Sequence, residues 1–339
     1  MNAHPTAMMR AIVQDRYGEA EVLRLEEVPV PTVRPGRVLV EVRAAGVDPG
    51  VWHLMAGVPG VIRLAAGLRK PRWPVRGAAF AGIVREVGDG VIGVEIGDEV
   101  YGTADGSFAE YALARADKIA AKPPSLTFEQ AAAVPISGPT ALQSLRDALR
   151  LEAGQHLLVL GAAGGVGHYA VQLGAAMGAR VTGAASAPKL DLVRALGAAA
   201  AIDYRSADPL EAGPYDAILD TGGLRPLAAM RRALTPTGAL AIVGGEDGGM
   251  GGLGRMLAAP IASALGRRRL AGVMSIESVA DLDAMTEWIE SGRVRPVVDR
   301  VFPLAEAANA LRHIDHGHGT AKTVLRIHAS SASPECRAY

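Results

Sequence analysis

The chain has 339 residues, which is longer than one ordinary hydrophobic core accommodates, so two domains are expected. Lysine plus arginine and aspartate plus glutamate number 35 each, and this balance argues against binding to nucleic acid or to a membrane surface through charge. The single cysteine, Cys336, excludes an internal disulfide and a thiolate-rich zinc site. Because no apolar run reaches membrane-spanning length and the first residues lack a secretory pattern, we expect a cytoplasmic protein.

Residues 1–126 have the pattern of a β-rich domain. Short runs of β-branched residues alternate with Gly and Pro turns, as in "RAIVQD", "RVLVEVRAAGV" and "FAGIVREVGDGVIGVEIGDEVYG". Several short strands at close spacing predict a barrel-like or sandwich-like module.

Residues 127–276 have a different pattern, in which strands and helices alternate. Ser125 or Thr127 is expected to cap a first helix, and "GPTALQSLRDALRL" predicts a second. From Gln155 onward, apolar strands such as "HLLVLG", "RVTGAAS" and "YDAILDTGG" are separated by helical segments. This alternation predicts an α/β domain with a doubly wound parallel sheet.

After the predicted helix "SVADLDAMTEWIESG", the chain returns to the earlier pattern. The segments "PVVDRVFPLAEAANALRHI" and "KTVLRI" are interpreted as β-rich, so residues 277–328 are expected to rejoin the first domain. Residues 329–339 are small and polar, which is typical of a flexible tail.

The strongest chemical motif is the turn in "HLLVLGAAGGVGHYAVQLG". A strand is predicted to end at Leu160 and a helix to begin near Gly165, and the small residues between them let the backbone approach a pyrophosphate. This context predicts a dinucleotide site rather than a purely structural turn.

The end of the next strand distinguishes between the two nicotinamide dinucleotides. It reads Ala184–Ala185–Ser186, without the acid that holds the ribose hydroxyls of NAD(H), and Lys189 follows. A hydroxyl and an ammonium attract a 2′-phosphate, so NADP(H) is the expected cofactor. The alternative is that Ser186 only caps the following helix and that Lys189 is solvated.

Together, these segments resemble the medium-chain dehydrogenase/reductase superfamily, in its zinc-free quinone oxidoreductase-like branch. The resemblance spans about Met9 to Ile327 and rests on "AAGVDPGVWHLMAG", "VREVGDGVIGVEIGDEVYG", "GSFAEYAL", "AAAVPISGPTALQSL", "LVLGAAGGVGHYAVQLGAAMGA", "AASAPKLDLVRALGAAAAIDYR" and "KTVL". It implies a GroES-like domain built from both ends of the chain, a central Rossmann domain, a site in the cleft between them and a homodimer.

The resemblance also implies functional positions. The implied pyrophosphate turn is Gly164, Gly165 and Val166, and the implied contacts of the 2′-phosphate are Ser186, Lys189 and Tyr204. The positions implied near the nicotinamide end are Thr140, Gly244 and Gly245. The cysteines and the His-Glu pair of zinc-dependent relatives are absent, and His53 alone cannot build a catalytic zinc site, so no metal is expected.

Two departures from the branch concern the cleft. Relatives commonly read Asn-Pro-x-Asp where this chain has Asp48–Pro49–Gly50–Val51, and they commonly carry Asp where this chain has Ala79. The reaction implied by the resemblance is hydride transfer to a quinone or an α,β-unsaturated carbonyl compound, followed by protonation.

The catalytic candidates are Asp48, His53 and Trp52. Asp48 is a general acid if it is desolvated, but an Asp before Pro is also a common turn residue. His53 titrates in a suitable range or packs between the domains, and Trp52 is a cleft wall or a core residue. Solvent is the third candidate for the proton source.

The glycine-rich segment 244–254 is expected to form a mobile lid or a surface loop, and the apolar run 256–265 is expected to pack against it or against the dimer partner. The expected substrate is a small molecule, a bulky apolar carbonyl compound. Three alternatives to a quinone or enone reductase stay open. They are a carbonyl/alcohol oxidoreductase, a specialised biosynthetic enzyme, which includes a non-redox one, and an NADPH-binding sensor without turnover.

Overall fold

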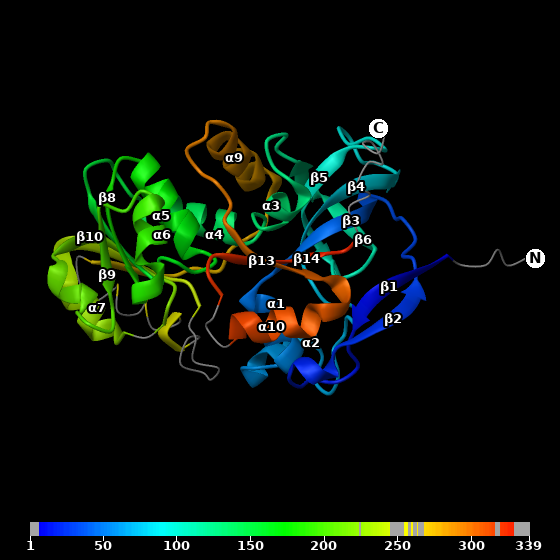
Figure 1. The fold of residues 1–339 in the computed structure, drawn as a ribbon, viewed down its shortest axis with the longest axis horizontal. Coiled ribbons are helices and arrows are strands. Elements are labelled where there is room, and N and C mark those ends of the chain that lie inside the picture. The colour runs from blue at the N-terminus through cyan, green and yellow to red at the C-terminus, as the bar shows by residue number, and fades with distance from the viewer. Residues whose placement is uncertain are drawn as a thin grey trace, which may run out of the picture.

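The computed structural model of the chain consists of two halves that lie side by side (Figure 1). It describes residues 7–223, 225–244, 254–256, 259, 263, 268–315 and 319–328. Gly245, most of the predicted lid and apolar run, and the tail 329–339 lie outside the described residues.

One half, green to yellow in Figure 1, is built on a parallel sheet and is called the parallel-sheet half. In the described part of the chain this sheet has six strands in the order β12-β11-β10-β7-β8-β9, and every neighbouring pair is parallel. The predicted doubly wound α/β fold is therefore confirmed. Its strands are β7 (His156–Leu160), β8 (Arg180–Ala185), β9 (Ala200–Asp203), β10 (Tyr215–Asp220), β11 (Leu234–Ile242) and β12 (Arg269–Gly272), and its helices include α5 (Gly167–Ala176), α6 (Leu190–Ala195) and α7 (Leu227–Ala233).

The strand order fixes where a ligand of this sheet is expected. β7 is paired with β8 on one side and with β10 on the other, so the direction of winding reverses beside β7. In open parallel sheets, ligands bind at this reversal, beyond the carboxyl ends of the strands. The predicted glycine turn directly follows β7, at that edge.

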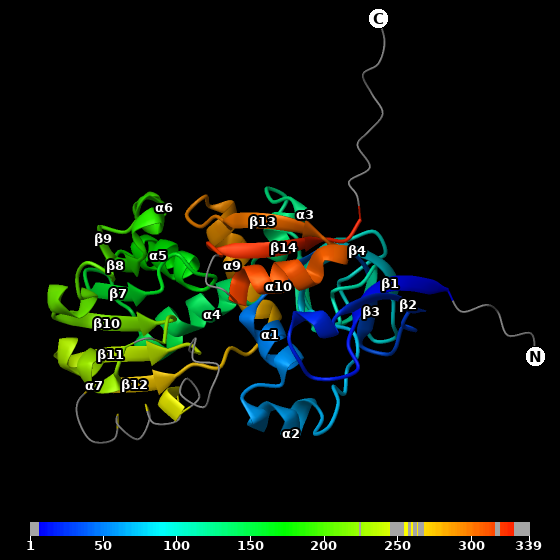
Figure 2. The same ribbon diagram turned by 60° about the horizontal axis from the view of Figure 1, so that its bottom comes forward.

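The other half, called the β-rich half, is built on a mostly antiparallel sheet that uses both ends of the chain. Among the described residues its order is β13-β14-β3-β4-β5-β6, and β3 also pairs with β6. In Figures 1 and 2 the orange and red strands β13 and β14 lie with the blue and cyan strands. Strands from both ends of the chain therefore lie in one sheet. The strands are β3 (Arg37–Val47), β4 (Ala79–Val87), β5 (Glu99–Asp105), β6 (Tyr111–Ala121), β13 (Val298–Pro303) and β14 (Lys322–Arg326), and β1 (Met8–Val13) and β2 (Arg24–Pro29) form a separate ribbon.

The segment after Pro303 is not β-rich as predicted, because it contains helix α10 (Ala307–Asp315). Ala307, Ala310 and Leu311 are buried at a spacing of three and four residues, so they form one apolar face of a helix. This helical spacing explains why "AEAANALRHI" forms a helix. The helix was not predicted because the neighbouring residues have a β-rich pattern.

The segment after Asp48 is also helical rather than a loop. Helix α1 (Pro49–Ala56) starts with Pro49 in its first turn, where a fixed φ suits a helix and a missing N–H costs nothing. Val51 and Met55, four residues apart, are its buried face. Short helix α2 (Arg63–Ala66) follows at the bottom of the molecule in Figure 2.

The two halves meet along helices α3 (Phe128–Ala132), α4 (Ser137–Gln143) and α9 (Val279–Glu290). Thr127 caps α3 as one of the two predicted caps, and it forms a capping box with Gln130. A π-helical segment, Ser144–Leu149, continues α4, so the predicted helix in this region is present. No helix in the described part of the chain is long and apolar enough to cross a membrane. The predicted domain limits at residues 126, 276 and 328 stay predictions.

Candidate functional site

The glycine turn after β7 is constrained by contacts within itself. Gly161 has φ +79°, a conformation that favours glycine. A Cβ on Gly167 would lie 2.0 Å from the Gly161 carbonyl oxygen, so only glycine fits where α5 begins. The predicted pyrophosphate residues Gly164, Gly165 and Val166 form the bend that leads into α5. The turn therefore has the close backbone approach and the helix N-terminus that a pyrophosphate needs.

His168, which the sequence motif did not single out, connects this turn to the returning chain. Its Nδ1 donates to the Gly164 carbonyl at 3.0 Å, and its Nε2 accepts from the Val297 N–H at 3.5 Å. Burial lowers the pKa of His168 to about 3, so the imidazole is neutral with its proton on Nδ1. A histidine four residues after the second glycine of the turn was the available signal.

The residues predicted to contact a 2′-phosphate gather at one edge of the sheet. Ala185 of β8 pairs with Asp203 of β9, so Ser186 and Tyr204 leave adjacent strands side by side. Lys189 lies one turn beyond Ser186, and its Nζ donates to the Gly319 carbonyl at 2.7 Å. A serine, a tyrosine and a lysine are thus brought to the carboxyl edge of the sheet, and their contact with a 2′-phosphate stays a prediction.

Asp203, the last residue of β9, is an acid at this edge. Its Oδ1 accepts from the backbone N–H of Arg205 at 3.1 Å, within its own turn. The guanidinium of Arg205 lies over the ring of Tyr204, 5.8 Å from its centroid. The edge therefore carries a second cation that the sequence pattern did not predict.

The residues predicted at the nicotinamide end are placed separately. Thr140 is buried in α4, and its hydroxyl donates to the Ile136 carbonyl at 2.6 Å. Gly244 follows β11 with φ +66°, and a Cβ there would meet no described residue within 4 Å. Gly245 lies outside the described residues.

A buried ion pair supports the sheet edge at β10. Asp220, the last residue of β10, is 1% exposed and pairs with Arg255. Its Oδ1 also accepts from the N–H groups of Gly222 and Gly223, at 3.2 and 3.0 Å. Asp220 thereby fixes the loop beside the glycine turn. Asp220 is visible in the segment "LDTGG", but its partner Arg255 is 35 positions further along the chain, so the pair could not be recognised from local sequence.

Helix α1 carries two of the three predicted catalytic residues, Trp52 and His53, and the third, Asp48, directly precedes it. Trp52 is partly buried against the core of the β-rich half, and its ring centroid lies 5.1 Å from that of His53. His53 Nδ1 donates to the Val58 carbonyl at 2.9 Å, at the end of the helix. Val51, which stands where the family resemblance implies an acid, is 4% exposed and packs in the same core.

Asp48 lies in a buried polar cluster at the junction of the two halves. Its Oδ1 accepts from Lys322 Nζ at the start of β14 and from Ser137 Oγ at 3.2 Å. Lys322 Nζ also donates to Ser137 Oγ at 3.1 Å. The exposed fractions of Asp48, Ser137 and Lys322 are only 2–3%. Neither Ser137 nor Lys322 was predicted as a site residue; a lysine that opens the apolar strand "KTVL" was the only signal.

No group of three or more His, Cys, Asp or Glu side chains in the described ranges is placed to hold a metal ion.

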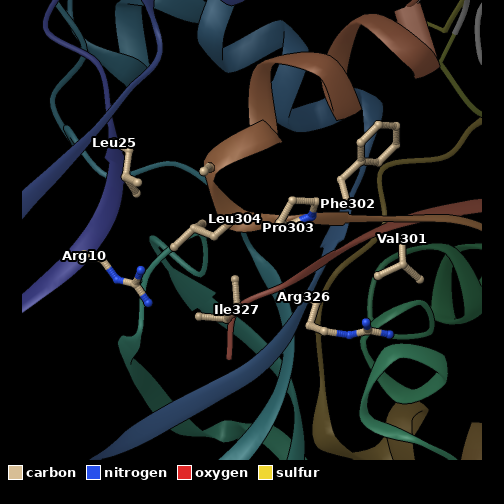
Figure 3. A pocket seen from close by; sticks show the side chains of 9 residues that line it. Arg10, Leu25, Val301, Phe302, Pro303, Leu304, Arg326 and Ile327 are labelled. Atoms are coloured by element: carbon tan, nitrogen blue, oxygen red, sulfur yellow. The ribbon is translucent and has the colours of Figure 1, made fainter. Parts of the chain in front are cut away.

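A separate surface pocket of about 510 Å³ lies on the β-rich half, between β2 and the β13–β14 pair (Figure 3). It is lined by Arg10, Leu25, residues 301–305, Arg326 and Ile327. None of the predicted site residues lines it, so it is distinct from the candidate site.

Comparisons with known proteins concern nearly the whole chain. Residues 34–124 match a family described as alcohol dehydrogenase GroES-like domain, and residues 196–325 match one described as zinc-binding dehydrogenase. The chain is 32% identical over 340 residues to the quinone oxidoreductase of Mus musculus, covering 94% of this chain and 98% of the mouse protein. It is 33% identical over 347 residues to the chloroplastic NADPH-dependent alkenal/one oxidoreductase of Arabidopsis thaliana, covering 94% and 79%. The solved quinone oxidoreductase from Coxiella burnetii superposes with a TM-score of 0.83 at 31% identity, covering 95% of this chain and 100% of that one.

Proposed function

Because this chain belongs to the quinone oxidoreductase-like branch of the medium-chain dehydrogenase/reductase superfamily, we propose that it is an NADPH-dependent reductase of quinones or α,β-unsaturated carbonyl compounds. Its similarity to a quinone oxidoreductase and to an NADPH-dependent alkenal/one oxidoreductase supports this substrate class. The observation that carries the choice of cofactor is the carboxyl edge of β8 and β9.

At that edge, Ser186, Lys189 and Tyr204 replace the acid that an NAD(H) site needs. The last residue of β8 is Ala185, so no carboxylate at this position repels a 2′-phosphate. The ammonium of Lys189 and the guanidinium of Arg205 supply positive charge on the same side. The edge is therefore suited to NADPH.

The turn residues fit the rest of the dinucleotide. Gly164, Gly165 and Val166 would hold the pyrophosphate, because their backbone borders the N-terminus of α5 and the glycines leave room beside it. When bound, the nicotinamide supplies the hydride for the reduction. Thr140 and Gly244 would border the nicotinamide end.

The proton of the reduction is proposed to come from water. Asp48 is sealed in an ion pair with Lys322, so its carboxylate does not meet a substrate in this arrangement. Nδ1 of His53 is hydrogen-bonded to the Val58 carbonyl at the end of α1. The Asp48 carboxylate and this nitrogen of His53 are thus both engaged within the protein.

The proposal is tested by following the oxidation of NADPH and of NADH with a panel of quinones, cyclic enones and alkenals, beside saturated ketones. We expect turnover with quinones or enones, and a higher kcat/KM with NADPH. Reduction of saturated ketones alone would favour a carbonyl/alcohol oxidoreductase. Tight NADPH binding without turnover on any acceptor would favour a binding protein or a specialised enzyme.

Zinc independence, a homodimer and a cytoplasmic location belong to the same proposal. Among the described residues, His53 belongs to no group of three or more His, Cys, Asp or Glu side chains that could hold a metal ion. Strand β12 is the outermost strand of the parallel sheet in the described part of the chain, so two copies could continue one sheet through it. Light scattering coupled to size-exclusion chromatography tests the dimer.

A further inference from the structure

The cluster of Asp48, Ser137 and Lys322 joins separate parts of the chain at the junction of the two halves. Asp48 precedes α1, Ser137 begins α4, and Lys322 begins β14. Asp48 and Lys322 are 274 positions apart, so the pair exists only in the folded chain. Burying two opposite charges away from water is costly unless their remaining hydrogen-bond donors and acceptors also have partners.

The pair is not fully satisfied. The Oδ2 atom of Asp48 is buried and has no hydrogen-bond partner, and Lys322 Nζ bonds only Asp48 and Ser137 among the described residues. An ammonium has three protons to donate, so the cluster can take one more acceptor. The function proposed above does not use this capacity.

The open capacity lies beside the glycine turn. A Cβ placed on Gly165 would lie 3.4 Å from Ser137 Oγ and 3.7 Å from Lys322 Cδ. The preceding residue, Ala321, donates its N–H to the Ala163 carbonyl at 2.7 Å. The stem of Lys322 therefore runs along the turn that would hold a pyrophosphate.

The charge of Lys322 also reaches the first turn of α5. Burial is the main cause of the lowered pKa of His168, and the ammonium of Lys322 lowers it further. One cation thus acts on both the Asp48 carboxylate and the turn.

We propose that Asp48 and the pyrophosphate of the dinucleotide compete for Lys322, so that Asp48 limits the affinity of the cofactor turn. In the absence of the dinucleotide, Asp48 neutralises the buried ammonium. When the dinucleotide binds, its pyrophosphate also pairs with the Lys322 ammonium, and the ion pair between Asp48 and Lys322 is weakened or broken. Asp48 is then a positioning residue for the cofactor, and the inference rests on the proposed binding of a dinucleotide.

The competition predicts opposite effects for the two partners. Asp48→Asn keeps the shape of the side chain and removes the competing charge, so NADPH and NADH should both bind about tenfold more tightly. Lys322→Met removes the shared cation, and both dinucleotides should bind about tenfold more weakly. This loss is independent of the 2′-phosphate, unlike the loss expected at Lys189.

The test is a double-mutant cycle on the full chain, read as the dissociation constants of NADPH and NADH from the fluorescence of the reduced nicotinamide. Lys322→Met alone leaves Asp48 buried without a counter-ion, so the Asp48→Asn/Lys322→Met protein is the safer partner in the cycle. When Lys322→Met is already present, Asp48→Asn should no longer tighten binding. Asp281→Asn is the matched control, because Asp281 is also a buried acid, and its side chain bonds Gln143, Arg146 and Ser278 instead.

Two results would overturn the inference while the proposed function stands. One is an Asp48→Asn protein that binds both dinucleotides no more tightly than the parent. The other is a gain of the same size in Asp48→Asn and in Asp281→Asn, which would show a general charge effect. A parent protein that binds neither dinucleotide would overturn the proposed function and this inference together.

Discussion

Replacing His168 with glutamine should remove part of the acid sensitivity of the folded protein. His168 is buried, its Nδ1 donates to the Gly164 carbonyl, and burial lowers its pKa to about 3. In the unfolded chain a histidine has a pKa of about 6.5. Between these values the unfolded state binds a proton that the folded state does not, so the free energy of unfolding falls as the pH falls below about 6.5.

The size of the effect follows from the two pKa values. At pH 5, protonation favours the unfolded chain by about 2 kcal/mol relative to pH 7.5, from this one group. The folded histidine carries almost no proton at pH 5, so the figure depends mainly on the unfolded chain. Burial also lowers the pKa of His156. His156 and the surface acids contribute the same pH dependence of stability in the parent and in the variant.

The assay compares urea unfolding of the parent and of His168→Gln at the two pH values. Glutamine does not titrate, and its amide can still donate to the Gly164 carbonyl. The parent should lose about 2 kcal/mol more than the variant on going from pH 7.5 to pH 5. Equal losses would refute the assignment of His168 as a neutral buried base.

Four further predictions concern the cofactor, the fold and metal. Lys189→Ala should weaken NADPH binding by roughly tenfold while NADH binding changes little, and equal losses for both would contradict a 2′-phosphate site. Gly167→Ala, which sets a methyl group against the Gly161 carbonyl, should destabilise the fold by roughly 3 kcal/mol and weaken dinucleotide binding; a thermal melt and a titration measure both. Thr127→Ala should cost about 1 kcal/mol of stability, because it removes one side of the capping box with Gln130. Elemental analysis should find no stoichiometric zinc, and dialysis against a chelator should leave turnover unchanged.

Local patterns predicted the parallel-sheet half well, because its signals are close together in the sequence. The strand, glycine turn and helix around Gly164 occupy consecutive residues, and so do Ser186 and Lys189. The same proximity explains why Thr127 could be named as a cap. Each of these features depends on backbone conformations that a few neighbouring residues determine.

The missed features depend on contacts between distant residues or on two competing local signals. Asp48 was recognised, but its partner Lys322 could not be, because periodicity and spacing carry no information across 274 positions. Helix α1 was hidden by Pro49, which favours both a turn and the first turn of a helix. Helix α10 was hidden by strands on both sides, although Ala307 and Leu311 have helical spacing.

The use of both chain ends in one sheet has a consequence for biosynthesis. The strands of the parallel sheet lie between His156 and Gly272, so they can all leave the ribosome before β14 exists. Strand β3 can pair with β4 and β6 but lacks its third neighbour until β14 is made, and the Asp48 carboxylate lacks its counter-ion until Lys322 is made. A nascent chain interrupted before Ala321 would lack the hydrogen bond from Ala321 to the glycine turn and the ammonium of Lys322. We therefore expect such an unfinished chain to bind the dinucleotide more weakly than the completed one.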